Sequence, residues 1–285
     1  INTTQDLLRL VPGLFIAQHA GGGKAEQLFL RGFDVDHGTD VAVSVDNMPV
    51  NMASHAHGQG YADLHFVIPE TVDNIQFNKG CYNANIGDFN TAGAVKFQTK
   101  NFLPDNKAKV EMGKFNTYRA LVLLNLIPKK DSMEQKHSAY IASEAFYSRG
   151  FFESPQHFNR YNIFAKYHGI VSKKTYITAS ISTFFSKWDA SGQIPDRAVD
   201  NGSIGWFGSI DNSEGGNTNR TNANIQVTTE AGKLGTWTNQ VYWSNYAFSL
   251  FSNFTLYKDD PIHGDEIHQY ENRNMLGLNS SLKND

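Results

Sequence analysis

Apolar and polar side chains alternate almost without interruption from Lys107 to the end of the chain, and this pattern limits the possible folds more than any other feature. The alternation is clearest between Thr221 and Ala231, and it recurs over residues 159–169 and 175–185. A period of two places successive side chains on opposite faces of a β-strand. This part of the chain is therefore predicted to be a series of strands with one apolar face.

Eight strands are predicted in this part. They lie near residues 107–115, 118–127, 137–150, 159–169, 174–189, 219–231, 235–254 and 268–283. The links after the second, fourth and sixth strands are short to moderate, whereas those after the third, fifth and seventh are longer, above all Ala190 to Thr218. Short turns at one rim and long loops at the other are typical of outer-membrane β-barrels.

The composition agrees with a membrane barrel and excludes several other classes. Aromatic residues make up 13% of the chain, and they suit both pleated surfaces and the aromatic girdles of barrels. A transmembrane helix is not predicted, because the chain has no run of about 18 apolar residues. The formal net charge of -3 lacks the basic field of a nucleic-acid-binding protein. The single cysteine, Cys81, excludes an intrachain disulfide and a multi-cysteine metal site.

Residues 1–106 have a mixed α/β pattern and are predicted to form a separate unit from residues 107–285. One short helix is expected over Asp6–Val11, where Pro12 and Gly13 end it, and another near Tyr61–Val67. Strands are expected at Leu28–Leu30, Val41–Val45, Val72–Phe77 and Ala94–Thr99.

The size of the first unit shows that eight strands cannot be the whole barrel. Side chains alone fill the interior of a closed eight-stranded barrel, whereas a barrel of about 22 strands has space for a plug. A globule of residues 1–106 would need the larger enclosure. The chain is therefore expected to be a fragment, with an incomplete barrel.

Five short motifs in the first unit resemble, in order, those of the plug domain of TonB-dependent outer-membrane receptors. They are Leu7–Leu14, Leu30–Phe33, Val45–Val50, Ile75–Gly80 and Gly87–Val95. Three positions depart from the family pattern: Lys79 replaces the usual Arg, Cys81 a common Pro, and Ala94 a usual Gly or Ile. The resemblance implies an α+β plug domain followed by antiparallel transmembrane β-barrel strands, of which about eight are present.

The resemblance also implies a function. Such receptors carry out active uptake of scarce nutrients, including iron chelates (siderophores), haem, metals and cobalamin, across the outer membrane of Gram-negative bacteria. The expected partners are outer-membrane lipid, a small-molecule or metal-chelate cargo, and the TonB–ExbB–ExbD complex. That complex would pull on a segment that precedes the plug and is not in this chain. We expect no enzymatic activity, no cofactor and no nucleic-acid partner. A passive porin, a barrel enzyme and a soluble β-rich binding module are the alternatives.

Histidines and methionines near the middle of the first unit are candidate cargo contacts. His37, His55 and His57 are candidates for cargo binding, and His55 and His57 with Met48 and Met52 are candidates for metal binding. Imidazole together with thioether sulfur favours copper, whereas imidazole alone favours zinc or a haem iron. The alternative, which we favour, is that these side chains hydrogen-bond within the plug or against the barrel wall. His55 and His57, two residues apart, would point to opposite sides of a strand, which is poor geometry for chelation.

Two cations of the plug, Arg31 and Lys79, are candidates for a plug–barrel lock. The family resemblance implies that they pair with acidic residues on the inner barrel wall, because a buried cation needs a carboxylate partner. A local salt bridge within the plug is an equal alternative. Asparagines on the predicted strands indicate a wet inner surface, and these are Asn222, Asn224, Asn239 and Asn245.

Overall fold

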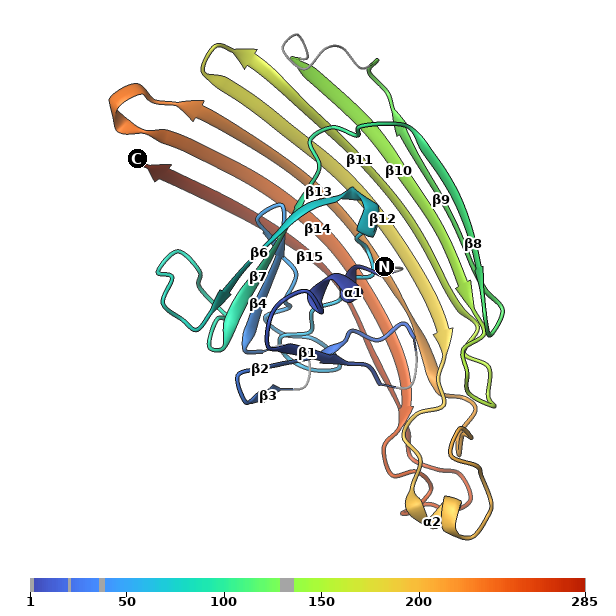
Figure 1. Cartoon of the computed structure of the whole chain (residues 1–285). Helices are drawn as coiled ribbons and strands as arrows, with labels where there is room; N and C mark the ends of the chain where they lie inside the picture. Colours follow the sequence, from blue (N-terminus) through green and yellow to red (C-terminus); the bar gives the residue numbers. More distant parts are fainter. Residues whose placement is uncertain (1–2, 20–21, 36–38, 129–135, 285) are drawn as a thin grey trace.

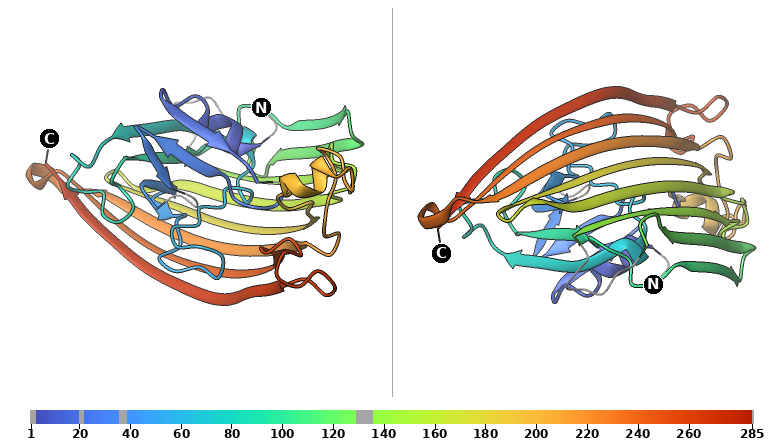
Figure 2. Two further views of the ribbon diagram at one scale, coloured as in Figure 1. Left: turned by 90° about the horizontal axis from the view of Figure 1, so that it is seen from below. Right: turned by 90° about the horizontal axis from the view of Figure 1, so that it is seen from above.

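The computed structural model describes residues 3–19, 22–35, 39–128 and 136–284. A long antiparallel sheet curves around a smaller mixed α/β domain, which lies on its concave side (Figures 1 and 2). We call the sheet the wall and residues 3–106 the globule. No helix among the described residues is long and apolar enough to cross a membrane.

The wall has eight strands in sequential order, each antiparallel to the next. They are β8 (Lys107–Gly113), β9 (Thr117–Asn125), β10 (His137–Ser148), β11 (Phe158–Ser172), β12 (Thr175–Asp189), β13 (Gly215–Glu230), β14 (Thr236–Asn253) and β15 (Glu266–Lys283). The predicted fold class, a plug-type globule followed by about eight antiparallel strands, is confirmed. The sequence alternation succeeded because it reports which face of a strand each side chain occupies.

The two rims of the wall differ. At one rim, which we call the short-turn rim, two residues join β11 to β12, and residues 231–235 with the 3-10 helix η3 (Gly232–Leu234) join β13 to β14. At the opposite, long-loop rim, residues 190–214 with helix α2 (Asp196–Asp200) and residues 254–265 make the connections. The β8–β9 turn at residues 114–116 is the one short link on the long-loop side of the described wall.

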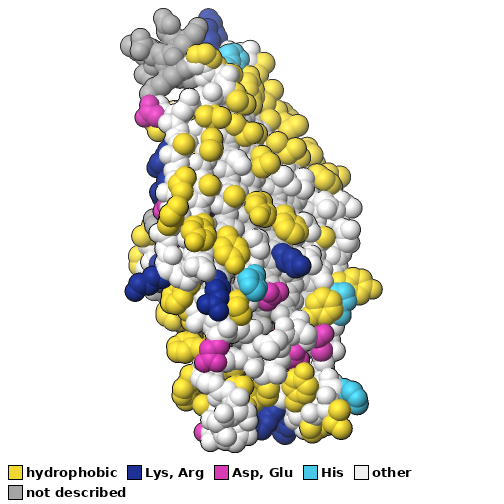
Figure 3. All heavy atoms as spheres, turned by 90° about the vertical axis from the view of Figure 1, so that its right-hand side faces the viewer, with side chains coloured by type: hydrophobic (Ala, Val, Ile, Leu, Met, Phe, Trp, Pro, Cys, Tyr) yellow, Lys and Arg dark blue, Asp and Glu magenta, His cyan; other side chains and the backbone are white. Residues whose placement is uncertain are grey.

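The convex face of the wall carries exposed apolar side chains. Ile163, Ile181, Ile225 and Val241 are between 48% and 56% exposed, although each lies in the middle of a long strand. Figure 3 shows apolar side chains along part of this outer surface. Such a face suits lipid, because alternate residues of a barrel strand meet the hydrocarbon.

The four strand asparagines do not all face inward, so that part of the prediction was wrong. Asn222 and Asn224 face the globule, whereas Asn239 pairs with Val227 on the outer face of β13 and Asn245 also lies on the outer side. Residues directly opposite in an antiparallel pair share one face of the sheet. Neighbouring side chains hydrogen-bond to the two outward-facing asparagines. For example, Ser280 Oγ donates to Asn239 Oδ1 at 2.8 Å.

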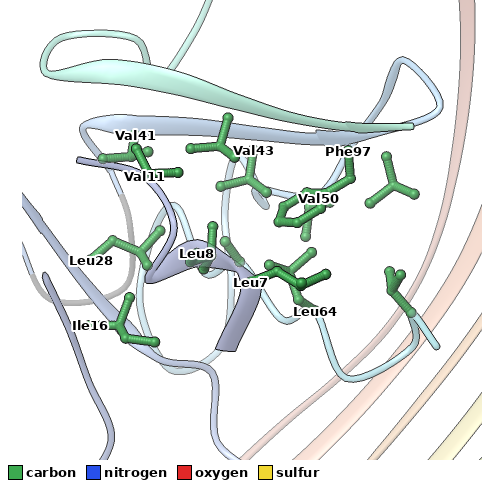
Figure 4. Close-up of a cluster of buried hydrophobic side chains, with 14 of the residues drawn as sticks. Leu7, Leu8, Val11, Ile16, Leu28, Val41, Val43, Val50, Leu64 and Phe97 are labelled. Carbon is green, nitrogen blue, oxygen red and sulfur yellow. The ribbon is translucent and has the colours of Figure 1, made fainter. Parts of the chain in front are cut away.

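Within its described residues, the globule has two small sheets and one short α-helix. Its elements are α1 (Thr4–Leu8), β1 (Leu14–Ala17), β2 (Gln27–Leu30), β3 (Phe33–Val35), β4 (Val41–Val45), β5 (Met48–Pro49), the 3-10 helix η2 (Pro69–Thr71), β6 (Val72–Lys79) and β7 (Gly93–Thr99). The sheets have the orders β1-β2-β3 and β5-β4-β7-β6, with β4 parallel to β7. Leu8, Val43 and Phe97, each at most 2% exposed, belong to the apolar core of the globule (Figure 4).

Helix α1 is shorter than predicted. Thr3 caps it, because the Thr3 side chain accepts from the backbone of Asp6 while the Asp6 carboxylate accepts from the backbone of Thr3. This reciprocal capping box fixes the first turn. The helix ends at Leu8, three residues before the predicted end at Val11.

The helix predicted over residues 61–67 does not form. The whole segment is buried, so it has no polar face to offer water. The Asp63 carboxylate instead accepts from the backbone N–H of His65 at 2.8 Å, and a single turn follows in which Val67 N–H donates to Leu64 O. Local side-chain acceptors of this kind compete with helical hydrogen bonds.

Candidate functional site

One guanidinium on the wall binds the globule through a buried ion-pair network. Arg119 of β9, 2% exposed, donates from both terminal nitrogens to Glu70 of η2 at 2.7 and 2.6 Å and from Nε to Glu144 of β10 at 2.6 Å. Glu111 and Lys109 of β8 complete the network. Bidentate pairs of this kind are among the stronger hydrogen bonds in proteins. Burial of Glu70 opposes its ionisation, but Arg119 outweighs that effect and lowers the pKa of the Glu70 carboxyl.

The network continues along the wall to a second contact with the globule. The side chain of Glu144 is fully buried, and its Oε1 accepts from Arg160 Nε at 2.9 Å and from Asn162 Nδ2 at 3.1 Å. The same Asn162 amide donates to the backbone carbonyl of His65 at 2.9 Å. Two guanidinium groups therefore balance the buried Glu144 carboxylate, which would be costly alone.

The turn between β4 and β5 makes a second set of polar contacts. Asp46 and Asn47 have φ angles of 47° and 62°, which Asp and Asn tolerate better than most residues. Lys166 of β11 donates to Thr99 Oγ1 at 2.8 Å and lies 3.4 Å from the Asp46 carboxylate. Gln240 of β14 donates to the Asp46 carbonyl at 2.7 Å. The tip of the turn is thus hydrogen-bonded to separate strands of the wall.

A further wall cation, Arg220 of β13, is 1% exposed. Its guanidinium lies 4.5 Å from the centre of the Phe66 ring and donates to the carbonyl of Pro49 at 3.2 Å. Its Nε donates to Asn222 Oδ1 at 2.9 Å. Arg119, Lys166 and Arg220 therefore all project from the concave face onto the globule.

Large side chains fill the contact nearer the long-loop rim. Trp188, at the end of β12, is 1% exposed and lies directly against Gly23 of the globule. A Cβ atom at Gly23 would lie 2.0 Å from the Trp188 ring, so only glycine permits this approach. We call the whole contact between globule and wall the seam.

Three ionisable side chains lie buried inside the globule next to the seam. His65 Nδ1 is 2.7 Å from Asp63 Oδ1. Burial opposes the charge on both groups, but their mutual attraction raises the pKa of His65 and lowers the pKa of Asp63. Burial raises the pKa of the neighbouring Glu26 to about 7, partly offset by His65.

The predicted cargo residues His55 and His57 lie together near the long-loop rim. His55 stacks on Tyr61 with ring centroids 4.1 Å apart, and its Nε2 is 3.1 Å from the Tyr246 hydroxyl. His57 Nδ1 is 2.9 Å from Gln269 Oε1 near the start of β15. We call these five residues, with Phe248, Phe254 and Glu271, the apical cluster. His55 and His57 thus hydrogen-bond against the wall, as the alternative to cargo binding expects.

The predicted metal set is only partly assembled. Met52 packs in the apolar cluster that contains Tyr61 and Tyr246, whereas Met48 lies in the separate core of the globule. His37 lies outside the described residues. Within the described part of the chain, no group of three or more His, Cys, Asp or Glu side chains could hold a metal ion. Metal binding by His55, His57, Met48 and Met52 stays a prediction.

The predicted lock residues lie away from the contacts described above. Arg31 is exposed in the β2–β3 turn, and the Lys79 ammonium lies 6.0 Å from the Phe77 ring. No ion pair between either cation and the wall occurs among the described residues, and their role as a lock stays a prediction. The wall cations escaped the sequence analysis, although one signal was available: each is a charged residue at an inward position of an alternating strand.

Comparisons with known proteins agree with this architecture. Residues 1–94 match the family model of the TonB-dependent receptor plug domain. Similar solved structures include the copper transporter OprC (TM-score 0.72, 15% identity, covering 100% of this chain and 40% of that one). The FrpB iron transporter of Neisseria meningitidis, F3-3 variant, has a TM-score of 0.71 at 15% identity over 100% of this chain and 44% of that one. The unliganded ferric citrate transporter FecA has a TM-score of 0.70 at 14% identity over 88% and 38%.

The globule is a receptor plug, and the wall has the fold of the barrel that encloses such a plug. Residues 1–94 thus belong to the plug-domain family of TonB-dependent receptors, and the eight strands that follow have the fold of barrel strands in the similar solved structures. The chain spans about two fifths of the length of the solved structures it matches. From here on we call the globule the plug.

Proposed function

We propose that the full-length protein is an active transporter of a scarce nutrient across the outer membrane of a Gram-negative bacterium, with energy supplied by TonB–ExbB–ExbD. The observation that carries this proposal is the way the plug is held. It occupies the concave side of a barrel-type wall (Figure 2) and is bound there by apolar contacts and by hydrogen bonds and ion pairs through Arg119, Lys166 and Arg220. We place the boundary between plug (1–106) and barrel (107–285) just before β8.

The long-loop rim is proposed to face the outside. Barrels of this type carry their longer loops on the extracellular side and short turns on the periplasmic side. Cargo entering from outside would then meet the apical cluster first. His57 and the 60% exposed Phe254 lie there, and we propose that this surface, with His55 beneath it, contacts the cargo.

The cargo is proposed to be a metal ion or a metal chelate such as a siderophore complex, haem or cobalamin. The names of the three similar structures refer to copper, iron and ferric citrate. Imidazole and carboxylate groups of His55, His57 and Glu271 offer donors for a polar or metal-bearing ligand. A passive porin is disfavoured because the plug lies on the concave side of the wall, where a porin keeps its water-filled channel.

Growth and uptake tests separate transport from the other classes. A strain lacking this receptor should fail to use one member of a panel of iron chelates, haem, cobalamin and copper, and the full-length gene should restore use only when TonB is present. Uptake that persists without TonB would indicate a porin. Recovery of the full-length protein in a soluble fraction, without heat-modifiable gel mobility, would indicate a soluble binding module.

A matched pair of histidine substitutions tests the cargo surface. His57→Ala should weaken binding of the identified cargo to the purified receptor roughly tenfold, the effect of losing one or two polar contacts. His137→Ala, at the short-turn rim, should leave binding unchanged. Equal affinities for His57→Ala and the unmodified receptor would exclude His57 as a cargo contact.

A further inference from the structure

Two cavities follow the seam from the short-turn rim towards the middle of the wall. The lower cavity has a volume of about 620 Å³, and its lining includes the inward side chains of Lys166, His168, Thr178 and Gln226. Tyr176 and Thr228 also line it, and both lie within a few residues of the turns at the short-turn rim. The lower cavity is therefore placed on the side that we assign to the periplasm.

The upper cavity lies further from that rim and is much smaller, at about 20 Å³. Its wall side includes the short or polar side chains of Ser180, Ser182 and Asn222, together with Phe164. Asp46, Thr99 and Asn224 line both cavities. The β4–β5 turn, which carries Asp46, therefore separates one cavity from the other.

Polar contacts bind the tip of this turn to the wall. Asn224 Nδ2 donates to the Asp46 carbonyl at 3.3 Å, in addition to Gln240 and Lys166 described above. Asn47 Nδ2 donates to Gln226 Oε1 at 3.2 Å. Such bonds can be exchanged for bonds to water at a small net cost, unlike apolar burial. The turn can therefore detach from the wall without disrupting the core of the plug.

We propose that the lower cavity is the exit vestibule for cargo and that the β4–β5 turn is its gate. Lys166 is the positioning residue that holds the gate closed, through Thr99 and Asp46. This inference rests on the proposed transport function and adds the route. Opening the turn joins the two cavities into a passage with polar side chains such as Thr178 and Ser182 on the wall and apolar side chains such as Phe66 in its upper part. Such a lining suits a cargo with both hydrogen-bonding groups and apolar surface. Closer to the long-loop rim, bulky residues such as Trp188 fill the seam.

Thiol accessibility tests the gate directly in the full-length receptor. In a Cys81→Ser background, we would place single cysteines in the lower cavity (Thr178→Cys) and in the upper cavity (Ser182→Cys). The probe is a small cationic methanethiosulfonate that does not cross membranes, applied to the receptor in detergent micelles. Thr178→Cys should react quickly and Ser182→Cys slowly.

Adding Lys166→Met should raise the labelling rate of Ser182→Cys roughly tenfold, because the Asp46 carboxylate loses its cation and turns to water. The rate at Thr178→Cys should not change. Lys187→Met, on the outer face of β12, removes a lysine from the wall without touching the turn and should have no effect. An unchanged rate at Ser182→Cys with Lys166→Met would overturn the gate.

A second variant covers the case in which Lys166→Met does not assemble, which its gel mobility would reveal. Asp46→Asn removes the same ion pair from the plug side, and it should raise the Ser182→Cys rate several-fold; no rise would again overturn the gate. Labelling needs neither cargo nor TonB. If the full-length receptor supports no TonB-dependent uptake, the transport function is refuted and the gate is not. If the labelling rate at Ser182→Cys is unchanged, the gate is refuted and the transport function is not.

Discussion

The core of the plug is held together by apolar contacts, whereas the seam combines apolar contacts with buried charged and polar groups. The plug core consists of apolar side chains such as Leu8, Val43 and Phe97. Exposing them to water costs the whole hydrophobic free energy of their burial. The seam has apolar contacts at residues such as Trp188, but at η2 and the β4–β5 turn it depends on charged and polar groups such as Arg119 and Lys166, whose hydrogen bonds water can replace. From this contrast we expect the polar part of the seam to open at a lower cost than the core of the plug.

The largest expected effect comes from the plug core. Phe97 is completely buried, so Phe97→Ala should lower the free energy of opening of the plug by about 3–5 kcal/mol. Hydrogen exchange of the full-length receptor should show this loss over β4 and β7, with wall amides unaffected. Phe15→Ala, at a side chain that is 66% exposed, is the control. An equal loss of protection in the wall would mean that core and seam are one cooperative unit.

A substitution in the seam should change hydrogen exchange at η2 and β9 and leave the plug core unchanged. Arg119→Met removes the shared partner of Glu70 and Glu144. It should lower the free energy of opening of the seam by about 3 kcal/mol, because the buried Glu144 carboxylate loses one of its two guanidinium partners. Exchange should quicken at η2 and β9 while β7 keeps its protection. Arg9→Met, which removes an exposed guanidinium from the plug, is the matched control. Loss of protection at β7 would contradict the separation of seam and core.

A pH series tests the buried carboxyl Glu26, whose pKa burial raises to about 7. Below the ordinary value of 4.5 the carboxyl is protonated in both folded and unfolded plug, so it has no effect on stability. As pH rises towards 7, only the unfolded plug gains by ionising, and the folded plug loses stability. Glu26→Gln should therefore stabilise the plug at pH 8 by on the order of 2–3 kcal/mol, and hardly at all at pH 4.5. Exchange rates corrected for intrinsic pH dependence measure this, and a benefit equal at both pH values would exclude the mechanism.

The smallest effect concerns one neutral hydrogen-bond donor. Asn162→Ala should cost about 1 kcal/mol, because its amide serves both the His65 carbonyl and Glu144. Combined with Arg119→Met, the two costs should not add, since both side chains bind Glu144. Strict additivity in this double-mutant cycle would show that the two contacts belong to separate networks.

Several features of this protein follow from the sequence alone. The eight wall strands, their alternating faces and the unequal rims were predicted, because period two is a local property of a strand and needs no knowledge of its neighbours. The plug motifs also identified the class of fold. The helix expected over Tyr61–Val67 failed because complete burial and the Asp63 acceptor, both set by surroundings, overrode local pattern.

Only the tertiary structure decided which residues meet across the seam. Arg119 and Glu70 are 49 residues apart, and Lys166 and Asp46 are 120 apart. Their contact depends on strand register, on the curvature of the wall and on how the plug is seated, none of which is encoded in a local window. Charge and alternation could mark Arg119, Lys166 and Arg220 as inward cations, but their partners come from the assembly of strands distant in sequence.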